Sequence, residues 1–489
     1  MARLVADPDR EGDVLVAPAT PPGVSALAVV RLTGPPGATR RVARQIARRL
    51  PEEPRPREAG LHLLVGEDGR PLDRALVLFF PAPHSSTGEE VVEFFCHGSP
   101  AIVAGLLAAA RAAGARPAAR GEFTRRALAN GKLDLAEAEG VAALASAESR
   151  GAARRALSLV EGELSRRVGA ARESILDVLA GLEAGLDFAE DVPAADLRAA
   201  GEILTAAAGE AEALAAAAAR GGPRDRRKAI AILGRPNAGK STLFNALVGR
   251  DRSIVTAVPG TTRDAIAETC EIGGEMVTLL DTAGLGATEN EVEKLGVAVA
   301  ERAGASADLV LYAIDASRGR SEEDEDFLRR GRGEEALVVR TKGDLVGASS
   351  EMTEDGGARA SPPASAAEAP PAVPFKENLS CPPSPFSIDL SVSALTGAGL
   401  EELRAEMAAR RFLVEADGEL LVLERHREAL VSGAALLREA AALARRETGE
   451  PELVAARVRE ALAALGTITG ETATEELLDR IFAAFCVGK

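Results

Sequence analysis

The first 125 residues alternate short apolar runs with clusters of turn-forming residues. SALAVVRL and RALVLFF are typical of strands, and TPPG, PAPHSSTG and HGSP mark the turns between such runs. We predict an α+β domain over residues 1–127.

Two later stretches carry a helical pattern. From about residue 130 the sequence is rich in Ala, Leu, Glu and Arg. The apolar positions at helical spacing are Ile175, Leu179, Leu182 and Leu186. The leucines that recur every seven residues near the end of the chain are Leu423, Leu430 and Leu437. Both stretches therefore predict helices.

Between these helical stretches, short β-like runs alternate with helix-like segments. The runs are KAIAILG, MVTLLDTAG, DLVLYAIDAS, ALVVRTKGD and FSIDLSVSA. This alternation is typical of a mostly parallel sheet with crossover helices, so we predict a multi-domain fold of α/β and α parts. The simplest organisation is a helical domain interrupted by an inserted α/β domain. The predicted boundaries are 128–222 and 411–489 for the helical parts and 223–410 for the insertion.

One segment of the insertion differs in composition. Residues 349–388 contain eight prolines among serine, alanine and glutamate. Such a composition buries too little apolar surface to offset the entropy lost on ordering. We expect a disordered loop there.

Charge and composition narrow the class of protein. The chain has 489 residues, enough for several cores, and 46% of them are hydrophobic. Because the formal net charge is −16, any RNA contact needs a local basic patch. The arginines crowded into one candidate patch are Arg40, Arg41, Arg44, Arg48, Arg49, Arg55 and Arg57. A solvated helix face explains these arginines equally well.

The cysteines and the start of the chain bear on the compartment. The four cysteines are Cys96, Cys270, Cys381 and Cys486. They show no CxxC spacing, which argues against a zinc site and a disulfide framework. No apolar run reaches membrane-spanning length, and the acidic first residues are unlike a signal peptide. We expect a cytoplasmic protein without membrane contact.

The strongest chemical motif follows the first strand of the insertion. Residues 234–242 read GRPNAGKST, which fits the phosphate-loop pattern GxxxxGK[ST]. Backbone N–H groups of such a loop surround phosphate oxygens, Lys240 would reach the β and γ phosphates, and Ser241 would bind Mg²⁺. The other loop residues expected at the nucleotide are Asn237, Ala238, Gly239 and Thr242.

Further motifs follow in the order expected of a Ras-like GTPase. In PGTTRD, Thr262 would close on Mg²⁺ when the γ phosphate is present. Gly273 and Gly274 predict the turn of a hairpin. In DTAG, Asp281 would hold Mg²⁺ through water, and the N–H of Gly284 would contact the γ phosphate.

The base would be read by TKGD and by Ser393-Ala394 after a later strand. Asp344 can accept from N1–H and the 2-amino group of guanine, whereas adenine would leave it unpaired. Such a mismatch is worth about 10⁴–10⁵ in discrimination, so we predict GTP rather than ATP. Lys342 keeps the lysine of this motif, and Thr341 stands where most GTPases have asparagine.

The residue after DTAG raises a question about hydrolysis. Ras-like enzymes place a glutamine there to orient the attacking water, and this chain has Leu285. Other groups must therefore orient the water and stabilise the developing charge.

Long segments outside these motifs resemble the tRNA modification GTPases of the MnmE, or TrmE, family. They are FPAPHSSTGEEVVEFFCHGSPA, GEFTRRALANGKLDLAEAEGV and GTITGETATEELLDRIFAAFCVGK, the last ending close to the family's FCIGK tail. The resemblance covers nearly the whole chain. It implies a GTP hydrolase that acts in tRNA modification.

The resemblance also implies an answer to the question that Leu285 raises. The family holds K⁺ with the phosphate-loop asparagine and with backbone oxygens of the first switch, where a positive charge can replace an arginine finger. The matching positions are Asn237, Thr256, Val258 and Thr261. A glutamate acts on the water, and its match is Glu293, although spacing alone fits a solvated helix residue. Gly286 replaces an arginine found in many members.

The family's first domain binds a tetrahydrofolate derivative, 5-formyl or 5,10-methylene, and forms a homodimer. The positions that match its folate contacts are Arg31, Glu93, Lys132 and Lys489. Cations suit the glutamate tail of folate, and a carboxylate can accept from the pterin ring. Without the resemblance, each would be interpreted as a surface charge.

Cys486 has two interpretations. It is either a nucleophile or redox participant in the uridine chemistry, or a packing residue beside Phe482 and Phe485. His426 has no visible serine, cysteine or metal partner, so we interpret it as structural.

The resemblance thus implies a K⁺-dependent GTP hydrolase that modifies C5 of the wobble uridine of certain tRNAs, by aminomethyl or carboxymethylaminomethyl addition. The family's partner, MnmG or GidA, carries FAD and would form a heterotetramer with the homodimer. The chain has no GxGxxG after a strand, so the flavin must come from that partner. Two alternatives stay open: a GTP-dependent ribosome assembly factor, and a folate-dependent one-carbon transferase with a regulatory G domain.

Overall fold

The chain forms two compact units. Unit 1 comprises residues 1–148, 152–223 and 418–489, and unit 2 comprises residues 149–151 and 224–417. Within them, the computed structural model describes residues 12–187, 196–221, 228–249, 266–281, 307–322, 324–325, 336–345, 389–409, 420–446 and 450–488. No helix in these ranges is both long enough and apolar enough to cross a membrane.

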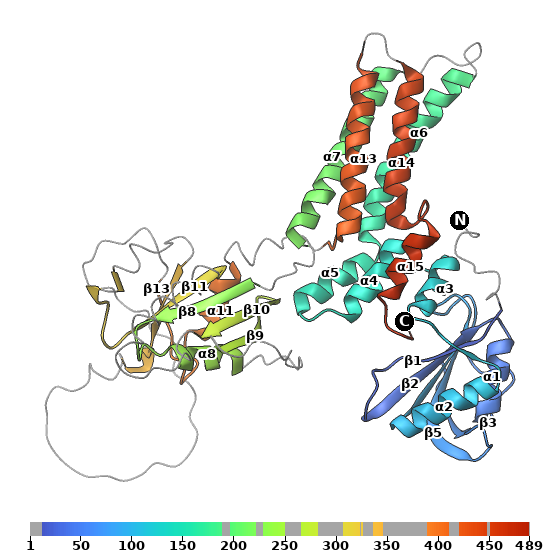
Figure 1. Ribbon diagram of the computed structural model, residues 1–489, viewed down its shortest axis with the longest axis horizontal. Helices are drawn as coiled ribbons and strands as arrows, with labels where there is room; N and C mark the ends of the chain where they lie inside the picture. The colour runs from blue at the N-terminus through green and yellow to red at the C-terminus, as the bar shows by residue number, and fades with distance from the viewer. Residues whose placement is uncertain are drawn as a thin grey trace. The chain divides into compact units, whose positions relative to one another are not determined.

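The N-terminal part of unit 1 is a seven-stranded sheet with two helices beside it (Figure 1), in the order β3-β4-β5-β6-β2-β1-β7. The strands are β1 (Leu15–Pro18), β2 (Ser25–Gly34), β3 (Ala47–Arg48), β4 (Gly60–Val65), β5 (Pro71–Phe80), β6 (Glu90–Gly98) and β7 (Arg116–Pro117). The helices are α1 (Ala38–Ile46) and α2 (Pro100–Ala112). Val30, Phe94 and Val77 face each other across three strands and are buried in one core with residues of both helices.

The opposite face of this sheet exposes apolar side chains. Strand pairing aligns Leu61 with Leu76, Leu76 with Phe95, and Phe95 with Val29. Leu61 is 65% exposed and Leu76 45%, and the other two are partly exposed. We call these four residues the open sheet face. A contiguous apolar row at the surface is typical of an interface.

The remainder of unit 1 is helical, and α6, α7, α13 and α14 lie side by side (Figure 1). The helices are α3 (Glu122–Ala129), α4 (Leu135–Ala145), α5 (Arg150–Val160), α6 (Glu163–Asp187), α7 (Leu197–Gly221), α13 (Glu424–Ala444), α14 (Pro451–Thr469) and α15 (Glu475–Ala483). Ile175, Leu182 and Leu430 are fully buried, as their spacing predicts, and Leu186 is only partly buried. The helical core contains residues from both segments of unit 1, the one before unit 2 in the sequence and the one after it.

A buried ionic cluster joins these two segments of the chain. Arg425 donates to Glu139 of α4 twice, from Nε to Oε1 at 3.0 Å and from Nη2 to Oε2 at 2.6 Å. His426 Nε2 donates to the same carboxylate at 2.6 Å, because its Nδ1 accepts from the N–H of Leu423. His426 is fully buried by this arrangement, which gives it a structural role.

The cluster makes the Glu139 carboxyl sensitive to pH. Burial raises its pKa, but hydrogen bonds from His426 and Arg425 lower it by more, so the pKa lies below its ordinary value of 4.5. The folded protein therefore binds this proton less readily than the unfolded chain does, and ionised Glu139 stabilises the fold. This stabilisation is complete above the ordinary value and is lost as the pH falls through the lower folded pKa.

Unit 2 is built on a six-stranded sheet in the order β13-β12-β11-β8-β10-β9. The strands are β8 (Lys228–Gly234), β9 (Ile266–Ile272), β10 (Glu275–Asp281), β11 (Leu309–Asp315), β12 (Ala336–Thr341) and β13 (Asp389–Ser391). The described helices include α8 (Lys240–Gly249) and α11 (Leu400–Ala409). Every pair is parallel except the β9–β10 hairpin, whose turn holds Gly273 and Gly274 at positive φ. The predicted parallel sheet and hairpin are confirmed.

Glu139→Ala should lower the free energy of unfolding by about 3–5 kcal/mol at neutral pH, because it leaves the charge of Arg425 partly buried without its partner. The difference from the unchanged protein should shrink as the pH falls below 4.5. Denaturant unfolding at several pH values measures both effects. Glu212→Ala removes an exposed carboxylate that pairs with Arg438, and it should leave the midpoint almost unchanged. Equal effects of the two substitutions would contradict this account.

Candidate functional site

The nucleotide motifs lie at the carboxyl ends of the parallel strands of unit 2. The phosphate loop follows β8, Asp281 ends β10, and Thr341 ends β12. The neighbours of β8 are β11 and β10, so successive parallel strands are added on both of its sides. The phosphate loop therefore occupies the switch point of the sheet, where open α/β sheets bind their ligands.

Glycines give the phosphate loop its shape. A Cβ on Gly234 would lie 2.2 Å from the carbonyl oxygen of Ala313 on β11, so a side chain cannot fit there. Gly239 has a φ of +84°, and Asn237 adopts a φ of +64° although it is not glycine. Asn237 is exposed. This left-handed backbone turns the loop so that α8 begins at Lys240.

Lys240 folds back over the loop. Its Nζ donates to the carbonyl oxygens of Gly234 and Arg235, both at 2.8 Å. Burial lowers the pKa of Lys240, and the negative charge of Asp281 partly opposes this shift. Asp281 is buried at the end of β10. The ammonium group is thus held over the loop and close enough to Asp281 to feel its charge.

Thr341 joins the loop predicted to bind the guanine base to the phosphate loop. Its hydroxyl donates to the carbonyl oxygen of Ala238 and lies 3.2 Å from that of Ile314. Because a hydroxyl carries one hydrogen, it serves one of these acceptors at a time. A Cβ on Gly239 would lie 3.2 Å from Thr341 Oγ1, so the two loops are in close contact. Thr341 therefore provides a hydrogen bond between the two loops, at the position where most GTPases have asparagine.

The adjoining lysine is held by a residue that the sequence analysis missed. Lys342 Nζ lies 2.7 Å from Asp315 Oδ2, at the end of β11. Burial raises the pKa of Asp315, but hydrogen bonds from Lys342 and Ser317 lower it by more, to about 2. Lys342 has a positive φ of 58°. The aspartate at the end of the strand LVLYAID was visible in the sequence. Its pairing with Lys342 could be inferred only from the order of the strands in the sheet.

The remaining base-reading residues are placed by backbone contacts. The N–H of Gly343 donates to the carbonyl oxygen of Val392 at 3.0 Å, which brings the loop of Asp344 beside Ser393. Ser393 is buried and accepts from the N–H of Thr396 through its hydroxyl. Asp344 is exposed, so its carboxylate is accessible to a base.

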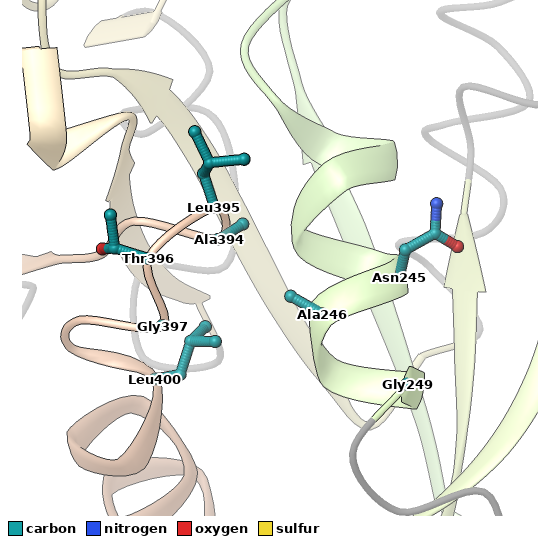
Figure 2. Close-up of a pocket in the computed structure, with 8 residues that line it drawn as sticks. All are labelled: Asn245, Ala246, Gly249, Ala394, Leu395, Thr396, Gly397 and Leu400. Atoms are coloured by element: carbon teal, nitrogen blue, oxygen red, sulfur yellow. The ribbon is translucent and has the colours of Figure 1, made fainter.

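A shallow pocket of about 220 Å³ lies between α8 and the loop after β13. Figure 2 shows Leu395 and Thr396 on the loop and Asn245 on α8, with the Asn245 amide pointing away from the loop. Ala394 is the single predicted nucleotide residue in its lining. The pocket is therefore beside the proposed nucleotide site rather than part of the phosphate loop.

In the N-terminal sheet, two of the predicted folate residues bind each other. Arg31 donates to Glu93 Oε1 from Nε at 2.8 Å and from Nη2 at 2.7 Å, across β2 and β6. The guanidinium carbon of Arg31 lies 5.9 Å from the centre of the Phe123 ring. Lys132 is exposed after α3 and packs beside Gly88. No interaction within the described ranges joins Lys132 to the Arg31–Glu93 pair.

The C-terminal tail lies against the N-terminal part of unit 1. The N–H of Gly121 donates to the carbonyl oxygen of Cys486. A Cβ on Gly488 would lie 2.1 Å from the carbonyl oxygen of Pro18, so the tail passes close to the backbone there. Phe482 and Phe485 are buried, as a packed helix end requires. Cys486 follows α15 and is exposed, so its interpretation as a packing residue is wrong.

Several predicted positions lie outside the described residues. They are Thr256, Val258, Thr261, Thr262, Gly284, Leu285, Gly286, Glu293, Cys381, Lys489 and the range 349–388. Ser241 and Thr242 are described and are exposed in the first turn of α8. The described part of the predicted nucleotide site thus contains the phosphate loop, Asp281 and both segments predicted to bind the base.

Two family models match the chain over most of its length. One, described as the MnmE helical domain, matches residues 135–486, and the other, described as the N-terminus of the GTP-binding protein TrmE, matches residues 14–132. Among solved structures, Aquifex aeolicus Era bound to GDP·AlF₄⁻ is 25% identical over 45% of this chain and 68% of that chain, with a TM-score of 0.24. A TM-score of this size supports no comparison of site geometry.

Full-length relatives extend this agreement. A Halorhodospira halophila protein described as tRNA modification GTPase MnmE is 40% identical over 98% of this chain and 97% of its own length. A Phenylobacterium zucineum protein with the same description is 42% identical over 98% of this chain and 100% of its own length. Since both family models and these relatives agree, the chain belongs to the MnmE, or TrmE, family of tRNA modification GTPases.

Proposed function

We propose that this chain hydrolyses GTP in the modification of tRNA. The observation that carries this proposal is the joined nucleotide site, in which Thr341 links the base-reading loop to the phosphate loop. Asp344 presents an exposed carboxylate beside this link, as guanine selection requires. Family membership supplies the tRNA context.

The oxygen donors present suit Mg²⁺. Ser241 offers a hydroxyl in the first turn of α8, and Asp281 offers a carboxylate at the end of a neighbouring parallel strand. Such oxygen ligands are those that Mg²⁺ prefers, and Ser241 would hold it directly. When bound, Mg²⁺ neutralises charge on the phosphates. The ammonium group of Lys240 would contact the same phosphates.

We further propose that K⁺ assists hydrolysis. The side chain of Asn237 is exposed on a left-handed turn of the phosphate loop, so its amide oxygen is accessible to a cation. A bound monovalent cation supplies the positive charge that an arginine finger supplies elsewhere. Thr256, Val258 and Thr261 are the proposed backbone donors, and Glu293 would orient the water that Leu285 cannot.

The open sheet face supports a homodimer. Its four apolar residues form a row across four strands and would be removed from water by a second copy. Arg31 and Glu93 lie two residues from Val29 and Phe95 on the same strands, and therefore on the same face. We propose that a tetrahydrofolate derivative binds there, with Lys132 and Lys489 contributing positive charge for its glutamate tail.

The proposed reaction adds an aminomethyl-type group at C5 of the wobble uridine, in the cytoplasm and together with an FAD-carrying partner. The chain would contribute GTP hydrolysis, the folate site and the exposed thiol of Cys486. The exposure of this thiol supports a chemical role, because a reactive cysteine must be reached by its substrate.

GTP turnover should be faster in K⁺ than in Na⁺ by on the order of 10²-fold, since a correctly sized cation stabilises the developing charge. Steady-state phosphate release in the two salts measures this ratio. Asn237→Gly is the matched variant, because glycine tolerates the φ of +64° and removes the side chain that carries the amide. It should lose the preference for K⁺ and keep its GTP affinity. Equal rates in both salts for the unchanged protein would refute the cation proposal.

Cells whose single gene copy encodes Lys240→Ala should lose the C5-modified wobble nucleosides, because the phosphate contact is removed. Mass spectrometry of nucleosides from purified tRNA measures this loss. Arg198→Ala, at a 90% exposed side chain on α7, is the control and should keep normal nucleosides. Normal wobble nucleosides in cells that lack the gene would rule out the proposed tRNA function.

A further inference from the structure

Four exposed arginines lie within nine residues at the edge of the N-terminal sheet. Arg41 and Arg44 are on the side of α1 away from the core, and Arg48 and Arg49 follow at β3. We call these residues the arginine face. Nearby Arg40 does not belong to it, because it forms an ion pair with buried Glu90, with Nε 2.9 Å from Oε1.

The arginine face has little negative charge to neutralise it. Arg44 reaches exposed Glu52 at 4.0 Å, and Arg48 donates to the carbonyl oxygen of Gly69. Within the described ranges, no side-chain hydrogen bond or ion pair is made by Arg41 or Arg49. A solvated helix face of the ordinary kind mixes both charges, whereas α1 contains no acidic residue.

Three exposed arginines on the helical domain differ from the arginine face, because each lies close to a carboxylate. They are Arg438 beside Glu212 at 2.6 Å, Arg457 beside Glu460 at 2.6 Å, and Arg459 beside Glu183 at 2.9 Å. The arginine face is therefore a local concentration of uncompensated positive charge on a chain of net charge −16.

Folding does not explain this concentration. Arg41 and Arg44 are three residues apart on α1, a spacing at which like charges repel. Arg49 has a φ of +64°, in the left-handed region that favours glycine or asparagine. The described residues include three other non-glycine positions with positive φ, and two of them, Asn237 and Lys342, belong to the nucleotide site. Arg49 therefore adopts a backbone conformation that is unfavourable for arginine.

The chemistry of the arginine face favours the phosphates of a helical RNA. Arginine matches phosphate oxygens with two parallel hydrogen bonds. A membrane surface is disfavoured because Val42 and Ile46, the large apolar residues of α1, are buried in the core and cannot insert. No aromatic residue lies between Arg40 and Arg57, which disfavours stacking on unpaired bases.

We propose that the arginine face binds the phosphate backbone of a double-helical stem of the tRNA substrate. This inference rests on the proposed function, and it adds the location at which the chain binds the RNA. The contacts read the shape and charge of the stem rather than its sequence. They position the RNA, and the modification chemistry takes place elsewhere.

The test uses the full-length chain and a variant that carries Arg41→Gln, Arg44→Gln and Arg49→Asn, since asparagine tolerates a left-handed φ. Fluorescence anisotropy with labelled tRNA should show binding weakened by about 10- to 100-fold. The slope of log affinity against log salt should become less steep by about 2. GTP hydrolysis without tRNA should be unchanged.

The control carries Arg438→Gln, Arg457→Gln and Arg459→Gln, which remove the same net charge from the helical domain. It should bind tRNA with unchanged affinity and unchanged salt slope. Equal tRNA binding by the arginine-face variant and the unchanged protein would overturn the inference and leave the proposed function standing. Absence of tRNA binding by the unchanged protein would overturn both. If the arginine-face variant lost binding to anionic phospholipid vesicles and kept binding to tRNA, the partner of the arginine face would be a membrane surface and not RNA.

Discussion

The nucleotide site depends on one short contact between two loops, the hydrogen bond from Thr341 to the backbone of the phosphate loop. The strands β8 and β12 are separated in the sheet by β11, so their loops meet only where side chains are small. Gly239 and Thr341 provide that closeness. A guanine base and its phosphates can then be held by one rigid surface, although the residues concerned are about 100 apart in sequence.

Asp315 adds a second constraint on the same surface. It ends β11, the strand between β8 and β12, and its carboxylate binds the side chain of Lys342. Its low pKa keeps it ionised at any physiological pH, so this support does not vary with proton concentration. Thr341 anchors the residue before Lys342 through its hydroxyl, and Asp315 anchors the side chain of Lys342 itself.

Unit 1 must bring together two distant parts of the chain, because its helical core is made from segments before and after unit 2. Glu139 binds Arg425 and His426, which lie more than 280 residues later and near the point where the chain returns. Such a buried cluster adds specificity of pairing, since a misplaced helix would leave charges unpaired. The fold of unit 1 is thereby tied to correct closure of the chain around the insertion.

The sequence predicts features that depend on local pattern and misses those that depend on contacts distant in sequence. The strand before the phosphate loop, the hairpin at Gly273-Gly274 and the buried positions Ile175 and Leu430 follow from periodicity and turn chemistry. The domain boundaries stay predictions, as do the switch residues and Glu293, which lie outside the described ranges.

Three features could not be read from the sequence. The Lys342–Asp315 pair requires the strand order, and the Glu139 cluster requires the packing of helices. The exposure of Cys486 follows from α15 ending at Ala483, a boundary that the apolar pattern does not mark. In each case tertiary structure decides the environment of a side chain whose type the sequence already gives.

The central claim is that the joined loops form a guanine nucleotide site. Equilibrium titration of the full-length chain with GTP and with ATP, in the presence of Mg²⁺, tests it most directly. The account predicts GTP binding tighter by on the order of 10⁴-fold, because adenine leaves Asp344 unpaired. Comparable affinities for the two nucleotides would contradict it.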